Sequence, residues 1–172
     1  MCTVKVSSAA LRNGVQAWRW YLLALLVVLL DQYTKGLASA SLDYGRPLAV
    51  FSWFNLTLQH NTGAAFSFLS DAGGWQRWFF TLVALVISAG LVVWLFVAER
   101  TNWLLALSLA LILGGAIGNV WDRIVLGYVV DFISVHYSGW YFPAFNLADS
   151  AITVGAACML LDGFIHRGED ND

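Results

Sequence analysis

Two stretches of about twenty residues without one charged side chain, 78–98 and 101–121, constrain the fold of this chain most strongly. A helix rises about 1.5 Å per residue, so each stretch is long enough to cross the hydrocarbon core of a bilayer. Only the short Glu99–Arg100 connection separates them, which predicts an antiparallel pair of membrane-spanning helices. The composition agrees: 12% of the residues are charged, against about 25% in soluble domains.

Two further spans are predicted at 18–40 and 146–165. The first apolar run continues into Asp31 without a small-residue cleavage site, so we interpret it as a retained span and not as a signal peptide. The last has a short uncharged core and works only if Asp149 and Asp162 lie near its two ends. We therefore expect an all-α membrane protein with four spans in a single domain, 1–172.

The two longer connections, 42–77 and 123–145, are expected on the outer side of the membrane. In 54–59, apolar and polar residues alternate, which is the pattern of a half-buried strand. The stretch 71–80 suits a short amphipathic helix at the membrane interface.

The orientation is predicted from Lys and Arg near the span ends. An inner N-terminus places five basic residues inside and four outside, which is a small bias. The flank before the first span, which usually dominates, holds three of the inner ones, and we expect both termini in the cytoplasm. The inner group is Lys5, Arg12, Arg19, Arg100 and Arg167, and the outer group is Lys35, Arg46, Arg77 and Arg123.

With this orientation, four carboxylates reach the outer side of the membrane. Ionised groups within or beside spans are costly and mark functional sites. Several amides and one arginine join the same layer. We interpret this polar layer as an active site, composed of Asp31, Asp122, Asp131, Asp149, Asn61, Asn119, Asn146 and Arg123.

Structural interpretations of the same residues stay open at this point. Asp149 would stabilise the first turn of a helix. Asp31 and Lys35 are four residues apart and suit a pair on a helix surface. Asp122 with Arg123 suits an interfacial anchor that carries its own counter-ion.

Two more positions have structural alternatives. Asn61 can form a turn before a glycine. Gly115 belongs to a run of small residues, 114–118, of the kind that allows close helix packing in membranes.

The residue types of the layer limit the chemistry. The chain has no HExxH or GxSxG motif and no P-loop, no metal-ligand spacing is visible around its histidines, and no basic block suggests nucleic acid. We expect neither a metal nor a cofactor. Two neighbouring carboxylates share a proton, so that one activates a water and the other protonates the substrate carbonyl. This suits aspartic peptide hydrolysis, with a proton-coupled transporter or a scaffold as alternatives.

Five motifs together resemble bacterial lipoprotein signal peptidase, also called signal peptidase II. They occur in the family's order across nearly the whole chain: DQYTK (31–35), NTGAAFSF (61–68), GGAIGNVWDR (114–123), VVDFI (129–133) and FNLADSAI (145–152). The resemblance implies an aspartic endopeptidase of the bacterial cytoplasmic membrane that cuts prolipoproteins just before a diacylglyceryl-modified cysteine.

The resemblance also implies a site and a fold. The catalytic pair would be Asp131 and Asp149. The fold would be a four-helix membrane bundle with an extracytoplasmic β-cradle and a short interfacial helix. Expected partners are lipidated prolipoproteins, membrane lipids and globomycin, a cyclic peptide antibiotic. Residues that bind substrate or support the site would be Asp31, Lys35, Asn61, Gly115, Asn119, Asp122, Arg123 and Asn146.

Overall fold

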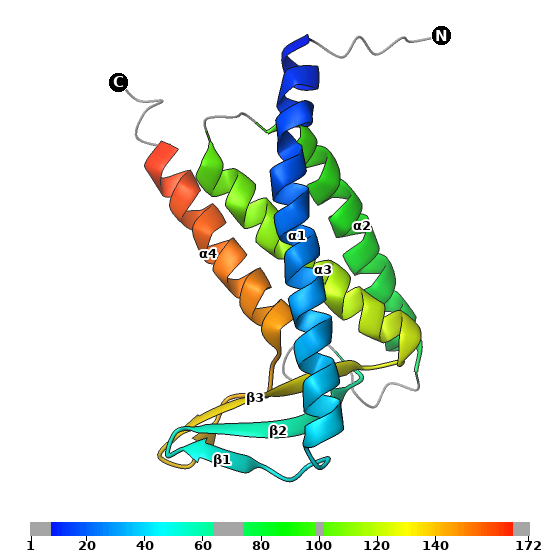
Figure 1. Cartoon of the computed structure of the whole chain (residues 1–172), viewed down its shortest axis with the longest axis vertical. Coiled ribbons are helices and arrows are strands. Elements are labelled where there is room, and N and C mark those ends of the chain that lie inside the picture. Colours follow the sequence, from blue (N-terminus) through cyan, green and yellow to red (C-terminus); the bar gives the residue numbers. More distant parts are fainter. Residues whose placement is uncertain (1–7, 64–73, 99–101, 167–172) are drawn as a thin grey trace.

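The computed structural model describes residues 8–63, 74–98 and 102–166, with side chains from Ala17 to Ile165. Four helices in these ranges are long and apolar enough to cross a membrane (Figure 1). The four expected spans are therefore confirmed, with boundaries that differ by a few residues, except that the first helix starts ten residues earlier than its predicted span. The helices are α1 (Ser8–Ser41), α2 (Trp75–Val97), α3 (Trp103–Val125) and α4 (Leu147–His166).

Helix α3 is the central helix of the bundle and packs against the other three. Its small residues allow this close approach. A Cβ atom on Gly114 would lie 2.7 Å from the carbonyl oxygen of Ala24 in α1, and one on Gly115 would collide with the backbone of Ala148 in α4. The predicted role of this run in close helix packing is confirmed.

The outward faces of the helices are apolar, as lipid contact requires. In α2 the side chains of Leu82, Val86 and Val93 are all more than 60% exposed. The buried cluster of the bundle lies between α1, α2 and α3 and consists of Ala24, Leu91, Leu95, Ala106, Leu109 and Leu113.

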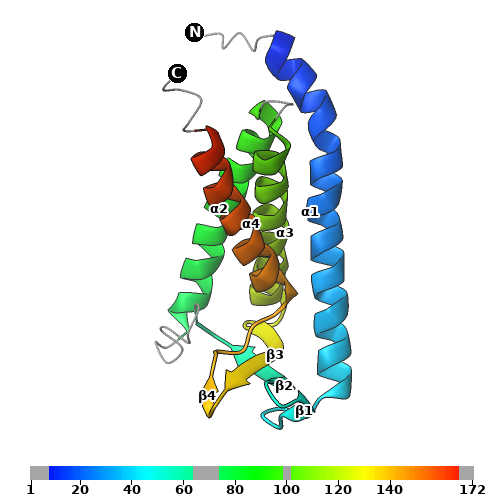
Figure 2. The ribbon, with the colours of Figure 1, turned by 90° about the vertical axis from the view of Figure 1, so that its left-hand side faces the viewer.

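A four-stranded antiparallel sheet lies beneath the end of the bundle where α1 ends and α4 begins (Figures 1 and 2). Its strands, in spatial order, are β1 (Leu48–Phe51), β2 (Phe54–Asn61), β3 (Val129–Tyr137) and β4 (Trp140–Tyr141). Each of the two long connections supplies one pair of strands. The strand expected at 54–59 is confirmed as part of β2.

The burial pattern along β2 is not a simple alternation of buried apolar and exposed polar residues. Asn55 and Thr57 are buried, whereas Phe54 and Leu56 are only half-buried. A register shift between Leu56 and Gln59 in the pairing with β3 interrupts the period of two. The buried positions of this strand are therefore Asn55, Thr57 and Leu58, whereas Gln59 and His60 are exposed.

Three sequence expectations need correction. Residues 75–80 form the first turns of α2, so the described residues contain no separate interfacial helix, and 64–73 lie outside the described ranges. Asp131 lies on strand β3 and not in a loop. The predicted span 101–121 stops before Asp122, but α3 continues beyond Asp122 through Arg123 and Ile124 to Val125.

Candidate active site

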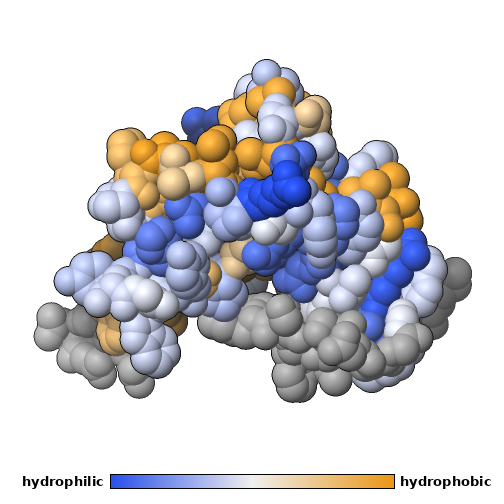
Figure 3. Space-filling view, turned by 90° about the horizontal axis from the view of Figure 1, so that it is seen from below, coloured by the Kyte–Doolittle hydropathy of each residue, from blue (hydrophilic) through white to orange (hydrophobic). Residues whose placement is uncertain are grey.

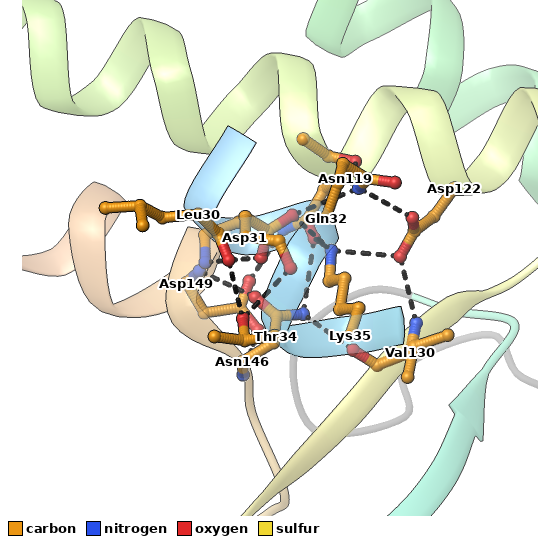
Figure 4. A network of polar contacts seen from close by, with 12 residues as sticks. Leu30, Asp31, Gln32, Thr34, Lys35, Asn119, Asp122, Val130, Asn146 and Asp149 are labelled. Atoms are coloured by element: carbon orange, nitrogen blue, oxygen red, sulfur yellow. Dashed lines mark hydrogen bonds and ion pairs between the residues drawn. The ribbon is translucent and has the colours of Figure 1, made fainter. Parts of the chain in front are cut away.

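The expected site residues converge where the bundle meets the sheet (Figure 4). They come from α1, β2, α3, β3 and α4, so distant parts of the sequence meet in one layer. Six of the polar ones are buried, namely Asp31, Lys35, Asn119, Asp122, Asp131 and Asn146. Such a concentration of buried polar groups is costly unless each group has a partner, and the contacts below supply those partners.

Asp131 is 2% exposed, and both its carboxylate oxygens accept hydrogen bonds. Asn146 Nδ2 donates to Oδ1 at 2.7 Å, and Asn61 Nδ2 donates to Oδ2 at 3.0 Å. Burial, followed by the charge of Asp149, raises the pKa of Asp131 to about 7, while the two amides and Lys35 act in the opposite direction. Asp131 can therefore gain or lose a proton near neutral pH.

Asp149 lies in the first turn of α4 and forms a capping box with Asn146. The backbone N–H of Asp149 donates to Asn146 Oδ1 at 2.9 Å, and the backbone N–H of Asn146 donates to Asp149 Oδ2 at 3.3 Å. The other oxygen, Oδ1, accepts from Asn119 Nδ2 at 2.8 Å. The structural interpretation of Asp149 as a residue that stabilises the start of a helix is thus confirmed, and its carboxylate also lies in the polar layer.

Asn146 connects the two aspartates. Its side-chain nitrogen binds Asp131, and its side-chain oxygen binds the backbone of Asp149. The same nitrogen lies 3.2 Å from the carbonyl oxygen of Val130 and 3.3 Å from Asn119 Oδ1. One fully buried amide therefore fixes the β3 carboxylate relative to the start of α4.

A buried ionic cluster lies behind this pair. Lys35 Nζ is 2.8 Å from Asp31 Oδ2 and 2.9 Å from Asp122 Oδ2, and it donates to Asn119 Oδ1 at 2.9 Å. The pair four residues apart in α1 therefore forms, but it is buried and not on a helix surface. The counter-ion of Asp122 is Lys35, so the expected anchor of Asp122 with Arg123 is wrong.

Arg123 contacts backbone instead. Its guanidinium donates to the carbonyl oxygens of Asn119 and Gly63, each at 3.3 Å. Asn61 forms the turn that its sequence suggested, because its Oδ1 accepts from the backbone N–H of Gly63 at 3.0 Å. Gly115 offers no chemical group and lets α3 approach α4 just before Asp149.

Sequence reasoning missed Gln32. Its Nε2 lies 2.9 Å from Asp122 Oδ1 and 3.2 Å from both Asp31 Oδ2 and the carbonyl oxygen of Gly118. The only available signal was its place beside Asp31 in the DQYTK motif. Two of its three partners, Gly118 and Asp122, are 86 and 90 residues away in the chain, and a single sequence cannot show such contacts.

The chemistry that this arrangement offers is acid–base chemistry by carboxylates. Within the described ranges, no three His, Cys, Asp or Glu side chains are grouped so as to hold a metal ion. His60, which lies next to Asn61, stacks on Tyr128 with ring centroids 3.9 Å apart, and burial lowers its pKa. Of the four aspartates in the layer, Asp31 and Asp122 form ion pairs with Lys35. The carboxylates of Asp131 and Asp149 accept hydrogen bonds from amide and backbone N–H groups.

Comparisons with known proteins agree with this geometry. The family model described as signal peptidase (SPase) II matches residues 23–165. Lipoprotein signal peptidase of Teredinibacter turnerae is 55% identical over 150 residues, which cover 87% of this chain and 89% of that protein. The protein of the same name from Pseudomonas putida is 57% identical over 158 residues, with 91% of each chain covered.

Two solved structures described as bacterial membrane enzymes share the fold. One has a TM-score of 0.79 and 30% identity, and covers 90% of this chain and 92% of that chain. The other has a TM-score of 0.72 and 33% identity, and covers 83% and 90% respectively. The motifs, the four spans, the sheet and the family match lead to one conclusion: this multi-pass membrane protein belongs to the signal peptidase II family of peptidases.

Proposed function

We propose that this protein is an aspartic endopeptidase that removes the signal peptide from prolipoproteins, cleaving just before the diacylglyceryl-modified cysteine. The observation that carries the proposal is the pair Asp131 and Asp149, linked through Asn146 at one end of a membrane bundle, with Asp131 buried and Asp149 half-buried. The family membership supplies the substrate class, since the matched relatives are named lipoprotein signal peptidases.

In the proposed reaction the two aspartates share one proton in the resting state, because two adjacent carboxylates do not both ionise readily. Asp131, with its raised pKa, holds the proton. Asp149 takes a proton from a water molecule as the water attacks the scissile carbonyl, and Asp131 protonates the carbonyl oxygen. As the tetrahedral intermediate collapses, Asp149 gives its proton to the leaving nitrogen and Asp131 takes a proton from a hydroxyl of the intermediate. The carbon–nitrogen bond breaks, the carbonyl forms again, and the pair returns to its resting protonation state.

The proposed location is the bacterial cytoplasmic membrane, with both termini cytoplasmic and the active site on the outer side. The contacts of the outer basic residues support this orientation. Lys35 is buried in the ionic cluster, Arg77 donates to the carbonyl oxygens of Arg123 and Ile124 at the end of α3, and Arg123 binds backbone. These three cations are held in place by contacts within the protein. Their presence on the outer side therefore does not count against the rule that Lys and Arg gather on the cytoplasmic side.

The substrate suits a site at this level of the bilayer. Viewed from the sheet end, hydrophilic residues form a band across the molecule, with hydrophobic residues along its border (Figure 3). The acyl chains of a lipidated precursor can stay in the bilayer while the peptide reaches the polar layer. Globomycin-type inhibitors, which resemble a blocked substrate, should compete for the same site.

Matched carboxylate-to-amide variants test the proposal. Asp131→Asn and Asp149→Asn should each abolish cleavage of a lipidated prolipoprotein in a gel-shift assay, because neither can complete the proton transfers. Asp43→Asn is the control, since its side chain is 77% exposed just after the end of α1. Thermal unfolding measured in detergent should show all three proteins folded. Near wild-type cleavage by either dyad variant would refute the assignment.

A further inference from the structure

We propose that Lys35 is a positioning residue that sets the placement of Asp131 relative to Asp149. It acts through two chains of contacts (arms), one through the carboxylate of Asp31 and one through that of Asp122, and through the amide of Asn119. This inference rests on the proposed function, because it assigns a role within that active site. A positioning role differs from a role in substrate binding. The hydrogen-bond geometry of the Lys35 ammonium distinguishes these two roles.

The three donors of the ammonium are matched by three acceptors. A lysine ammonium has three N–H groups and no acceptor. Lys35 Nζ has Asp31 Oδ2, Asp122 Oδ2 and Asn119 Oδ1 at 2.8 to 2.9 Å, and its side chain is 3% exposed. Lys35 therefore has no donor left for a substrate and can act only through these neighbours.

The first arm leads to the α4 aspartate. Asp31, paired with Lys35 through Oδ2, accepts the backbone N–H of Ala148 at 2.9 Å through its other oxygen. Ala148 is the residue immediately before Asp149. The ion pair thus fixes the start of α4, and with it the Cα position of one member of the catalytic pair.

The second arm leads to the β3 aspartate, and here a single carboxylate oxygen makes both contacts. Asp122, paired with Lys35 through Oδ2, accepts the backbone N–H of Val130 at 3.1 Å (Figure 4). Val130 is the residue immediately before Asp131. One ammonium therefore ties together the two backbone positions that precede the catalytic pair.

The amide contact sets the direction of a further hydrogen bond. The two ends of an Asn amide have nearly the same shape, and their neighbours determine which end is which. Because Lys35 can only donate, Asn119 must turn its oxygen toward Lys35 and its NH₂ toward Asp149, to which it donates at 2.8 Å. Without the cation, Asn119 Oδ1 loses the shorter of its two donor contacts and keeps only Asn146 Nδ2 at 3.3 Å.

The test compares Lys35→Met, Lys35→Arg and the double variant Asp31→Asn/Lys35→Met on a lipidated prolipoprotein. The double variant keeps the net charge of the cluster and an acceptor for the N–H of Ala148. It therefore replaces Lys35→Met in the test if that single variant does not fold. Asn102→Ala is the stability control. It removes the N-cap of α3 and a 3.1 Å bond to Asp162, in the part of the bundle where α4 ends.

We expect Lys35→Met and the double variant to lower kcat by about 10²-fold, the size of effect that a misplacement of about 1 Å produces, with KM nearly unchanged. Asn102→Ala should lower the unfolding temperature and leave kcat near the wild-type value. A kcat near wild type in folded Lys35→Met or in the double variant would overturn the inference. An equal loss of kcat in Asn102→Ala at a matched unfolding temperature would also overturn it.

The pH profile gives a second readout that general destabilisation would not move. Charged groups that act on Asp131 are Asp149 from α4, Lys35 from α1, and Arg123 from α3. Burial and Asp149 raise the pKa of Asp131, and Lys35 lowers it. Loss of the cation should move the alkaline limb of kcat to higher pH, whereas Lys35→Arg should keep it in place. An unshifted limb in Lys35→Met would contradict the inference.

Failure of this inference can be distinguished from failure of the proposed function. If Asp131→Asn is inactive and the Lys35 variants are fully active, the dyad stands and the positioning role falls. If Asp131→Asn itself remains active, the proposed function falls, and the positioning role falls with it.

Discussion

At the scale of single residues, the motifs predict which carboxylates form the catalytic pair, but they do not predict how these carboxylates are held. Asp131 and Asp149 follow from the motifs, and the structure brings both into one polar layer. They are positioned by an ammonium, several amides and two backbone N–H groups. Together these partners come from five elements. Gln32 and the backbone contacts at Ala148 and Val130 depend on the three-dimensional arrangement and leave no local signal in the sequence.

The pH dependence of cleavage is a prediction at this scale. Asp131 must be protonated to act as the acid, and its pKa is raised to about 7. Deprotonation removes the acid, so kcat should fall as pH rises through about 7. The measurement is a kcat profile on a lipidated prolipoprotein from about pH 5 to 9. A rate that stays constant across the alkaline half would contradict the assignment of Asp131 as the acid.

The same shift predicts a stability effect. The folded state raises the pKa of Asp131 above its usual value of 3.8, so the native protein favours the protonated form. Stability should therefore decrease as pH rises from about 4 through about 7. Asp131→Asn removes this titration and should raise the unfolding temperature at about pH 8, with little difference at about pH 4. Thermal unfolding in detergent at both pH values checks it, and destabilisation at about pH 8 would count against it.

At the scale of elements, hydropathy predicted the four helices because lipid requires long apolar segments with satisfied backbones. The alternation in 54–59 predicts β2, whereas no comparable alternation marks β3, which contains Asp131. Strand β3 carries the apolar run VVDFISV interrupted by one carboxylate, and its pairing with β2 is formed by residues about 70 positions apart. The local pattern of apolar and polar residues cannot show strand pairing across that distance in the sequence.

Helix packing gives a prediction at the element scale. A methyl group on Gly115 would collide with the backbone of Ala148, whereas one on Gly163 in α4 would meet nothing within 4 Å. Gly115→Ala should destabilise the protein by about 1–3 kcal/mol through overpacking and lower kcat by displacing the start of α4. Gly163→Ala is the matched control and should be neutral or slightly stabilising. Equal unfolding temperatures for the two variants would refute the packing argument.

At the scale of the whole molecule, the fold places a polar site at one end of an apolar bundle. Helix α1 begins at Ser8 and helix α4 ends at His166, and both of these helix ends lie at the opposite end of the bundle from the sheet (Figure 1). A substrate that carries acyl chains and a peptide can therefore be held by lipid and protein at once. The family match predicts this chemistry from sequence, whereas the sidedness depends on a charge bias that is weak.

Sidedness is tested by cysteine labelling in cells, with Cys2 and Cys158 replaced. Ser138 lies exposed in the turn between β3 and β4, on the proposed outer side. Ser138→Cys should react with a membrane-impermeant maleimide in intact cells of a strain whose outer membrane admits the reagent. Asn171→Cys near the C-terminus should react only after the cytoplasmic membrane is permeabilised. The reverse labelling pattern would place the site on the cytoplasmic side.

Lipidation of the substrate should dominate its recognition. Buried acyl chains contribute about 0.8 kcal/mol per CH₂, far more than a few peptide contacts. Removing the diacylglyceryl group should therefore raise KM by several orders of magnitude. Steady-state cleavage of matched lipidated and unlipidated precursors measures this. Equal KM values would show that the lipid does not contribute to binding.

The most direct test of the central claim, that Asp131 and Asp149 together activate the attacking water, is the single-turnover cleavage rate of a lipidated prolipoprotein. Excess enzyme removes product release from the measurement, so the rate reports the steps up to and including peptide-bond cleavage. The account predicts that Asp131→Asn and Asp149→Asn each give no cleavage above background, while Asp43→Asn cleaves at the wild-type rate. A folded dyad variant that cleaves at a rate near that of the wild type would contradict it.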